Sequence, residues 1–298
     1  SVELQETLEA MEDEKRVLKL GILGRVKAGK SSLLNALVFD GEDVLPKAAT
    51  PMTAALTVLQ YGDTTKAKVD FFTQEDIDNI KETANRYEEK LNNIKASEYE
   101  KLKKVRLRKE KLEKLSPEQE QEVKDKALNI AQRELKKDDN LSSSYDQYQK
   151  IKSSGVTVDE LEQYKSIEAK DIMELNGKLF DFVGSSGKYM PFTKSVTMTI
   201  QKESLKDIQI IDTPGVNDPV VSREDRTRKL LKKCDVVLIV SPSGQFLSSE
   251  DTELMARVRS KEGINKLYLI ASQVDNQLYG SEKESILSSA LTKIETKL

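Results

Sequence analysis

Histidine is absent from this chain of 298 residues, and cysteine occurs once, as Cys234. The lack of histidine excludes a Ser-His or Cys-His relay, a histidine general base and histidine metal ligands. One cysteine cannot form an intrachain disulfide, so we expect a protein of a reducing compartment. Cys234 itself is interpreted as a small buried apolar group.

Long apolar runs and a strong charge of one sign are also missing. No run approaches the roughly 20 residues that span a bilayer, and segment 1–16 lacks the apolar centre of a signal peptide. Lys and Arg number 48 against 51 Asp and Glu, so no overall field indicates nucleic acid or acidic lipid. We therefore expect a cytoplasmic protein and no nucleic-acid partner.

Apolar strand segments alternate with helical segments along much of the chain. Strands are predicted at 17–23, 67–72, 195–200, 208–211, 235–240 and 266–271, and helices at 222–234 and 248–263. A short amphipathic helix is predicted from Leu4, Leu8 and Met11. The alternation predicts an α/β fold with a mostly parallel sheet and helices on both faces.

Residues 74–175 differ in character, because they are dense in Lys, Glu, Gln and Asp. We predict a charged helical insertion, packed as hairpins, within a discontinuous domain formed by 1–73 and 176–298. Helix starts are expected at Thr73, Ser116 and Thr157, and 136–147 is interpreted as a polar break. The expected apolar stripes are Leu128, Ala131 and Leu135 in one helix, and Leu102, Val105, Leu112 and Leu115 in another.

The most basic stretch of the insertion, 101–114, has two interpretations. It is a contact for anionic lipid or nucleic acid, or it is a solvated helix face helped by pairs such as Glu110 with Lys114. We favour the solvated face. Aromatic residues do not interleave the stretch, which gives little support to single-strand nucleic-acid binding.

The segment GRVKAGKS, 24–31, fits the pattern G-x-x-x-x-G-K-[ST] between a predicted strand and a helix with Leu33, Leu34 and Leu37 on its buried face. Glycines allow the loop amides and the helix N-terminus to face phosphate oxygens. Lys30 is expected to reach the β- and γ-phosphates, and the Ser31 hydroxyl to bind Mg²⁺. The candidate nucleotide-binding residues here are Gly24, Arg25, Val26, Ala28, Gly29, Lys30, Ser31 and Ser32.

A second motif, DTPG at 212–215, follows a predicted buried strand. The Asp212 carboxylate can hold a magnesium-bound water there, and the Gly215 N–H can meet a γ-phosphate. An ordinary strand-to-turn junction explains Pro214 and Gly215 but not their pairing with the upstream loop. The two motifs together predict a nucleoside triphosphatase.

The segment Ser272-Gln273-Val274-Asp275 follows another predicted strand. Asp275 occupies the place of the acid that specifies guanine, although the usual pattern Asn/Thr-Lys-x-Asp has a lysine where this chain has Gln273. We predict GTP as the substrate and GDP as the product, with Gln273 and Asp275 as nucleotide contacts. The structural alternative for Asp275 is a helix N-cap.

Four segments, 24–37, 45–62, 183–198 and 212–219, resemble in content and order the GTPase domain of bacterial dynamin-like proteins. In particular they resemble the labile enterotoxin output type. Leu45-Pro46, the Pro51-x-Thr53 triplet and the Thr57-Val58-Leu59 strand are more specific than the phosphate loop alone. The resemblance covers about 18–72 and 180–275 and implies a dynamin-type P-loop NTPase fold.

The resemblance also implies roles for individual residues. Thr53 matches the switch threonine that closes on Mg²⁺ and places the attacking water, with Thr50 as its competitor. Lys27 lies where atlastins and guanylate-binding proteins have a catalytic arginine, and Arg25 is its substitute; a surface lysine without a catalytic duty is the alternative. The implied catalytic residues are Lys27, Lys30, Thr53 and Gly215, and the implied metal ligands are Ser31, Thr53 and Asp212.

The function that the resemblance implies is Mg²⁺-dependent GTP hydrolysis coupled to membrane remodelling or vesicle-associated processes. It further implies a homodimer across the nucleotide face. It also implies peripheral membrane association through lipid-contacting regions outside this chain. We interpret the chain as a fragment truncated near its C-terminal end. Two alternatives are a regulatory or ribosome-associated GTPase, and a nucleotide-binding scaffold with negligible turnover.

Overall fold

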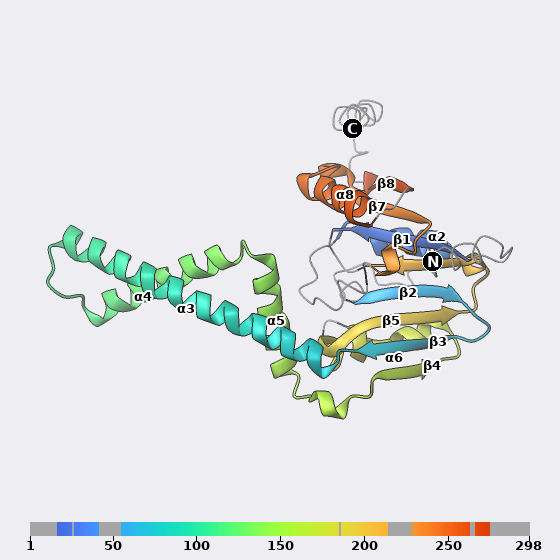
Figure 1. Cartoon of the computed structure of the whole chain (residues 1–298), viewed down its shortest axis with the longest axis horizontal. Helices are drawn as coiled ribbons and strands as arrows, with labels where there is room; N and C mark the ends of the chain where they lie inside the picture. The colour runs from blue at the N-terminus through green and yellow to red at the C-terminus, as the bar shows by residue number, and fades with distance from the viewer. Residues whose placement is uncertain are drawn as a thin grey trace, which may run out of the picture. The chain divides into compact units, whose positions relative to one another are not determined.

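The computed structural model describes residues 17–25, 27–41, 55–184, 186–213, 227, 229–262 and 266–274 (Figure 1). These residues fall into two compact units. The first, the sheet unit, holds the described residues up to Phe71 and from Asp159 onward; the second, the helical unit, holds 72–158. The predicted helix at residues 4–11 and the start of the one at 222–234 lie outside the described residues.

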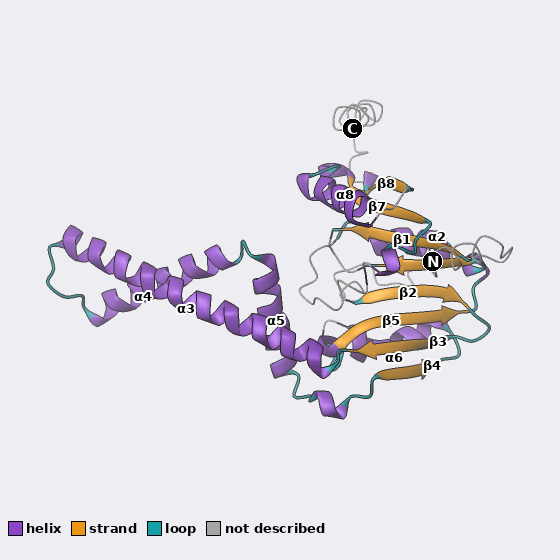
Figure 2. Cartoon of the chain, in the orientation of Figure 1, coloured by secondary structure: helices purple, strands orange, loops and turns teal. Residues whose placement is uncertain are grey.

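The described part of the sheet unit contains one eight-stranded sheet. Its strands are β1 (Leu18–Gly24), β2 (Leu56–Tyr61), β3 (Lys66–Phe71), β4 (Tyr164–Glu168), β5 (Thr193–Ile200), β6 (Ile208–Asp212), β7 (Val236–Pro242) and β8 (Leu267–Ser272). Their order is β4-β3-β5-β2-β6-β1-β7-β8 (Figure 2). Neighbours pair in parallel at β6-β1, β1-β7, β7-β8 and β2-β5, whereas β2-β6, β3-β4 and β3-β5 are antiparallel. The mostly parallel sheet is as predicted.

The central strands are covered on both faces. Ile22 and Leu23 are neighbours in β1, so their side chains point to opposite faces, and both are buried. Helices α2 (Lys30–Val38), α6 (Ile172–Val183) and α8 (Ser249–Glu262) belong to the same unit. Helix α8 closely matches the helix predicted at 248–263.

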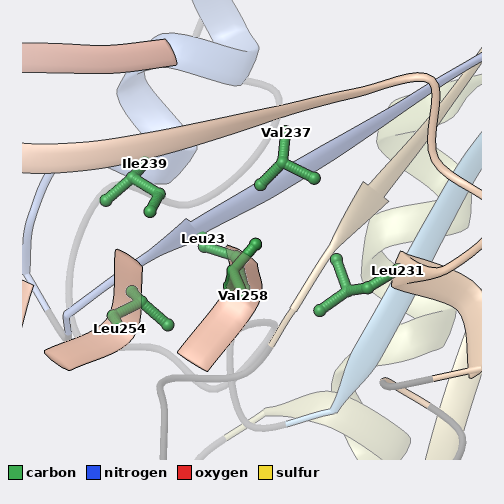
Figure 3. Close-up of a cluster of buried hydrophobic side chains, with 6 residues drawn as sticks. All are labelled: Leu23, Leu231, Val237, Ile239, Leu254 and Val258. Carbon is green, nitrogen blue, oxygen red and sulfur yellow. The ribbon is translucent and has the colours of Figure 1, made fainter. Parts of the chain in front are cut away.

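The core beside α8 joins residues far apart in sequence (Figure 3). Side chains from β1, from β7 and from α8 pack against one another, together with a leucine that precedes β7. The cluster consists of Leu23, Leu231, Val237, Ile239, Leu254 and Val258. This packing supports β1 and β7 close to where the strand-loop-helix motif begins.

The helical unit consists of α3 (Gln74–Glu110), α4 (Pro117–Leu135) and α5 (Asp139–Ser153), and α3 packs against both of the others. Two of the predicted helix starts are confirmed. Thr73 forms a capping box with Asp76, and Ser116 forms one with Gln119, with a proline in the first turn of α4. The third, Thr157, precedes only a short 3₁₀ turn at Val158–Glu160.

The predicted limits of the insertion differ from the structure. Residues 164–168 form β4, an edge strand paired with β3, so the helical unit ends near 158 instead of 175. Because Ile167 is the only buried residue of β4, its composition resembled that of the helices. The break expected at 136–147 is shorter than predicted: it covers only 136–138, since α4 ends at Leu135 and α5 begins at Asp139 after the N-cap Asp138.

Several predicted apolar stripes differ as well. In α4, Ala131 and Leu135 are buried as predicted, whereas Leu128 is half-buried and Val123 and Ala127 complete the buried face. In the other predicted stripe, Val105 and Leu112 are exposed. In α2, Leu34 and Val38 are buried while Leu37 is 51% exposed. Helical spacing alone permits more than one apolar stripe, and the packing partner selects which one is buried.

Replacing Ile239 by alanine tests the core beside α8. Ile239 is fully buried, so Ile239→Ala is expected to lower the free energy of unfolding by about 2–5 kcal/mol through lost burial and a cavity. Urea denaturation followed by circular dichroism measures the change. The control Leu37→Ala, at a half-exposed position, is expected to cost at most about 1 kcal/mol. Equal costs for the two variants would contradict the placement of this core.

Candidate phosphate-binding site

Two glycines shape the loop that joins β1 to α2. Gly24 has φ +154° and pairs with Val240 of β7; a Cβ on Gly24 would lie 2.5 Å from the carbonyl oxygen of Val240. Gly29 has φ +93° and precedes the first residue of α2. A side chain at Gly24 would therefore push β1 and β7 apart, and one at Gly29 would strain the backbone.

Among the described residues, no side chain caps the N-terminus of α2, and its first turn contains no acidic residue. Its first N–H groups therefore remain available to an anion, which the helix dipole also favours. Ser31, half-buried, and Ser32, exposed, lie in this turn.

Lys30 is the most buried cation near this helix end, with 4% of its surface exposed. Its Nζ donates to the carbonyl oxygens of Gly24 at 2.8 Å and Arg25 at 3.1 Å. Burial lowers the pKa of Lys30, and the negative charge of Asp212 acts in the opposite direction. The ammonium is therefore held inside the loop by backbone carbonyls.

Asp212 ends β6, beside Ile22 of β1 in the parallel register. The next residue fixes this end of the strand, because the N–H and the hydroxyl of Thr213 both donate to the carbonyl oxygen of Ile22, at 3.2 and 3.1 Å. Asp212 is buried, and its Oδ1 has no hydrogen-bond partner among the described residues. Burial raises the pKa of Asp212 to about 7, although the charge of Lys30 lowers it.

These residues fit a phosphate-bound divalent cation. The unpaired oxygen of Asp212 is a hard acceptor, of the kind that Mg²⁺ or its bound water takes, and the open end of α2 suits phosphate. Ser31 lies at the same helix end. The structure thus brings together Lys30, Asp212 and the loop amides that the sequence predicted from two separate motifs.

The end of β8 clamps the loop from another side. The Ser272 hydroxyl donates to the carbonyl oxygen of Ala28, and Nε2 of Gln273 donates to that of Lys27 at 2.7 Å. The hydroxyl of Ser243 in turn donates to the carbonyl oxygen of Gln273 at 2.8 Å. Sequence reasoning placed Gln273 at the nucleotide but missed these contacts with the loop. The only sequence signal for them was a glutamine at the position where the usual pattern has a lysine.

Arg25 is fixed by α8. Its Nη1 donates to Oε2 of Glu250 at 3.0 Å, and its Nε lies 3.4 Å from Oδ1 of the fully buried Asp251. Asp251 also accepts hydrogen bonds from the hydroxyls of Ser241 at 2.7 Å and Ser248 at 3.0 Å. This network gives the Arg25 side chain a structural role. It does not support Arg25 as a substitute for Lys27 in catalysis.

Sequence reasoning missed the Arg25 network, although Ser248 and Asp251 show the S-x-x-D spacing of a capping box. That spacing predicts the start of α8 but not its contact with the loop. The side chain of Lys27 is exposed. Val26, Thr50, Thr53, Gly215 and Asp275 lie outside the described residues, so their roles stay predictions.

The fold and the site together define a class of protein. A parallel β1-β6 pair, a glycine loop leading into α2, a buried lysine in its first turn and an aspartate ending β6 are the parts of a P-loop NTPase. A sequence model of the Dynamin family matches residues 20–272, and the chain belongs to this family. It is therefore a dynamin-family GTPase domain.

Individual relatives agree with the family. The chain is 31% identical over 274 residues to Dynamin-like protein 1 of Campylobacter jejuni, which covers 91% of this chain and 29% of that protein. It is 49% identical over 55 residues to the Bacterial dynamin-like protein of Nostoc punctiforme, over 18% of this chain and 8% of that one. The narrower resemblance to the labile enterotoxin output type stays a prediction.

Solved structures show the same fold. Two chains of an oligomerised bacterial dynamin pair, described as providing a mechanism for long-range sensing and tethering of membranes, match the whole chain with TM-scores of 0.60 and 0.56 at 23% and 21% identity. The chain covers 39% and 38% of them, and so spans well under half of its relatives. Among the described residues, no helix is long and apolar enough to cross a membrane.

The raised pKa of Asp212 predicts a pH dependence of stability. In the unfolded chain Asp212 loses its proton near 3.8, whereas the folded chain keeps it until about 7. The free energy of unfolding of the wild type, relative to Asp212→Asn, should therefore fall as the pH rises from about 4 to about 7, by roughly 1 kcal/mol per pH unit, and level off above. Urea titrations without nucleotide or Mg²⁺ measure it, and a pH-independent difference would contradict the burial of this carboxyl.

Proposed function

We propose that this chain binds GTP with Mg²⁺, hydrolyses it to GDP, and in the full-length protein couples hydrolysis to membrane remodelling or vesicle-associated processes. The observation that carries the proposal is the burial of Lys30 and Asp212, whose charges act on each other, with Lys30 in the first turn of a helix that no described side chain caps. An ammonium, a carboxylate oxygen with no partner among the described residues, and a helix end that none of their side chains caps suit a triphosphate with its divalent cation.

The loop residues bind and position the nucleotide in this proposal. Backbone amides from Gly24 to Ser32 hold the phosphates, and Lys30 exchanges its two backbone carbonyl partners for β- and γ-phosphate oxygens. Bound Mg²⁺ neutralises charge on the phosphates, and Ser31, Thr53 and Asp212 are the residues proposed to hold it, Asp212 through water.

Catalysis rests on positioning and electrostatics, since the chain has no histidine to act as a base. Thr53 orients the attacking water, and the Gly215 N–H donates to the γ-phosphate. Lys27 stabilises charge between the β- and γ-phosphates. Support for Lys27 comes from its exposed side chain on a loop whose backbone Gln273 fixes.

Guanine recognition is assigned to Asp275, with Gln273 in a supporting role. The Gln273 amide nitrogen donates to the Lys27 carbonyl oxygen, so the Gln273 side chain holds the loop in place. A neutral amide provides this hydrogen bond without the positive charge of a lysine. We therefore expect Gln273 to act on affinity for GTP and GDP alike.

Self-association and membrane contact are proposed from the related structures, without naming the residues that form the contacts. Two matching solved chains come from an oligomerised bacterial dynamin pair described as sensing and tethering membranes. By analogy we propose a homodimer across the nucleotide face and peripheral membrane association through regions outside this chain. The alternative is a regulatory or ribosome-associated GTPase. Co-sedimentation of the full-length protein with liposomes distinguishes this alternative from a membrane-associated GTPase.

The Lys30→Ala variant tests nucleotide binding. Because Lys30 supplies the buried positive charge, we expect GTP and GDP affinity to fall at least roughly 100-fold and multiple-turnover phosphate release to stop. Calorimetry and a phosphate assay measure these, with Lys233→Ala as an exposed-lysine control. Unchanged binding by Lys30→Ala would sink the phosphate-loop assignment. Tight binding by the wild type without phosphate release would favour the scaffold alternative.

The Gln273→Ala variant tests the clamp on the loop. Loss of the hydrogen bond to Lys27 is expected to weaken GDP binding roughly fivefold, since one neutral hydrogen bond is worth about 1 kcal/mol. The matched control is Gln209→Ala, which removes a similar hydrogen bond, to Gln60 at 2.9 Å between β6 and β2. Equal GDP affinities in the two variants would show that the clamp does not act on the nucleotide.

A further inference from the structure

The last turns of α3 and the segment after it carry the strongest local charge of the helical unit. Between residues 101 and 114, eight side chains are Lys or Arg and two are Glu. The structure shows how this charge divides between the side of α3 that packs on α4 and the side that faces solvent. This division was not accessible from the sequence.

Some of the cations are neutralised on the α4 side. Arg106 forms ion pairs with Glu122 of α4 at 2.6 Å and with Glu110 at 3.0 Å. The second oxygen of Glu110 accepts from Gln119 of α4 at 2.9 Å, so contacts with Arg106 and Gln119 replace the pair of Glu110 with Lys114 expected from the sequence. Lys103 lies over the ring of Tyr99, 5.5 Å from its centroid.

The other cations gather on the opposite side, which we call the outer α3 face. Lys101, Lys104 and Arg108 recur at i, i+3 and i+7, so they line one side of the helix. The outer α3 face consists of Lys101, Lys104, Val105, Arg108, Lys109, Lys111 and Leu112, all of them exposed. Val105 is 62% and Leu112 37% exposed.

Most of these cations have no acidic partner. Lys101 pairs with Glu98 at 2.7 Å, whereas Lys104, Arg108, Lys109 and Lys111 form no ion pair with any described residue. A solvated face usually mixes both signs of charge. Apart from Glu98, which pairs with Lys101, and the exposed Glu113 beside Leu112, this face carries cations with two apolar side chains between them.

We propose that the outer α3 face binds the surface of an anionic lipid bilayer. Clusters of four to eight Lys or Arg on a helix suit acidic headgroups, and each cation near the surface contributes roughly a fivefold gain in binding. Val105 and Leu112 lie among the cations, where apolar side chains can enter the boundary between headgroups and acyl chains. The helix lies on the membrane and does not cross it.

Lipid is favoured over nucleic acid by the composition of the face. Proteins that bind single strands interleave aromatic residues with basic ones, because the rings stack on bases. The outer α3 face has none, and its uncharged members are aliphatic. This contact is separate from the lipid regions proposed outside the chain.

Co-sedimentation of the nucleotide-free chain with vesicles tests the proposal. The wild type is expected to bind phosphatidylcholine vesicles that contain phosphatidylglycerol, to release them at high salt, and to ignore pure phosphatidylcholine. The variant Lys104→Glu/Arg108→Glu/Lys109→Glu should lose binding at least roughly tenfold. Circular dichroism and thermal unfolding establish that the variant remains folded.

The matched control carries the same change of net charge elsewhere in the helical unit. Lys126→Glu/Lys136→Glu/Lys150→Glu alters three exposed lysines away from the outer α3 face and is expected to lose no more than roughly threefold. Equal losses in both variants would overturn the proposal, because net charge alone would then explain binding. So would a wild type that does not distinguish the two kinds of vesicle.

Binding of the outer α3 face to a partner other than lipid would give a different experimental result. If the outer-face variant loses affinity for a labelled RNA, measured by fluorescence polarisation, while its vesicle binding is unchanged, the face binds nucleic acid and the lipid proposal fails. If only self-association changes, measured by analytical ultracentrifugation, the occupant is a second copy and the proposal fails equally. A second lipid variant, Val105→Ser/Leu112→Ser, should weaken vesicle binding severalfold at low salt, because it removes the apolar contact and keeps every cation.

Discussion

The burial of Lys30 and of Asp212, whose charges act on each other, is the constraint around which the sheet unit is organised. Two opposite charges removed from water are costly, and their mutual attraction offsets only part of that cost. Burial accordingly lowers the pKa of Lys30 and raises that of Asp212. The parallel register of β1 and β6 enforces the arrangement, because it sets Asp212 beside Ile22, just before the loop begins. The folded chain thus keeps a cation and an acceptor oxygen ready for a charged ligand.

The loop around this pair is held from three sides, which limits how far it can rearrange. Thr213 ties the end of β6 to β1, Gln273 ties the end of β8 to Lys27, and Arg25 reaches the buried Asp251 of α8. None of these contacts contributes a group to the proposed phosphate site itself. Their effect is to fix the backbone before a ligand arrives, which reduces the ordering that binding requires.

In the helical unit, local sequence signals set where the first helices begin, whereas packing between helices sets which surface charges are paired. Its first two helix starts are encoded by the capping boxes at Thr73 and Ser116, which join residues only three apart in sequence. The start of α5 lacked such a box and was read as a break. Which cations of α3 become neutralised depended on where α4 placed Glu122, and so no pattern within α3 could reveal the exposed remainder.

The sequence by itself determined the glycine loop with Lys30, the strand that ends in Asp212, the dynamin-like order of motifs and the cap-encoded helices. These features depend on neighbours within a few residues, whose backbone preferences and charges act locally. Only the tertiary structure decided that β4 joins the sheet, that Leu37 faces solvent, that Gln273 braces Lys27 and that Arg25 belongs to α8. The last two contacts join residues more than 200 positions apart, and such pairings exist only once the sheet has brought its strand ends together.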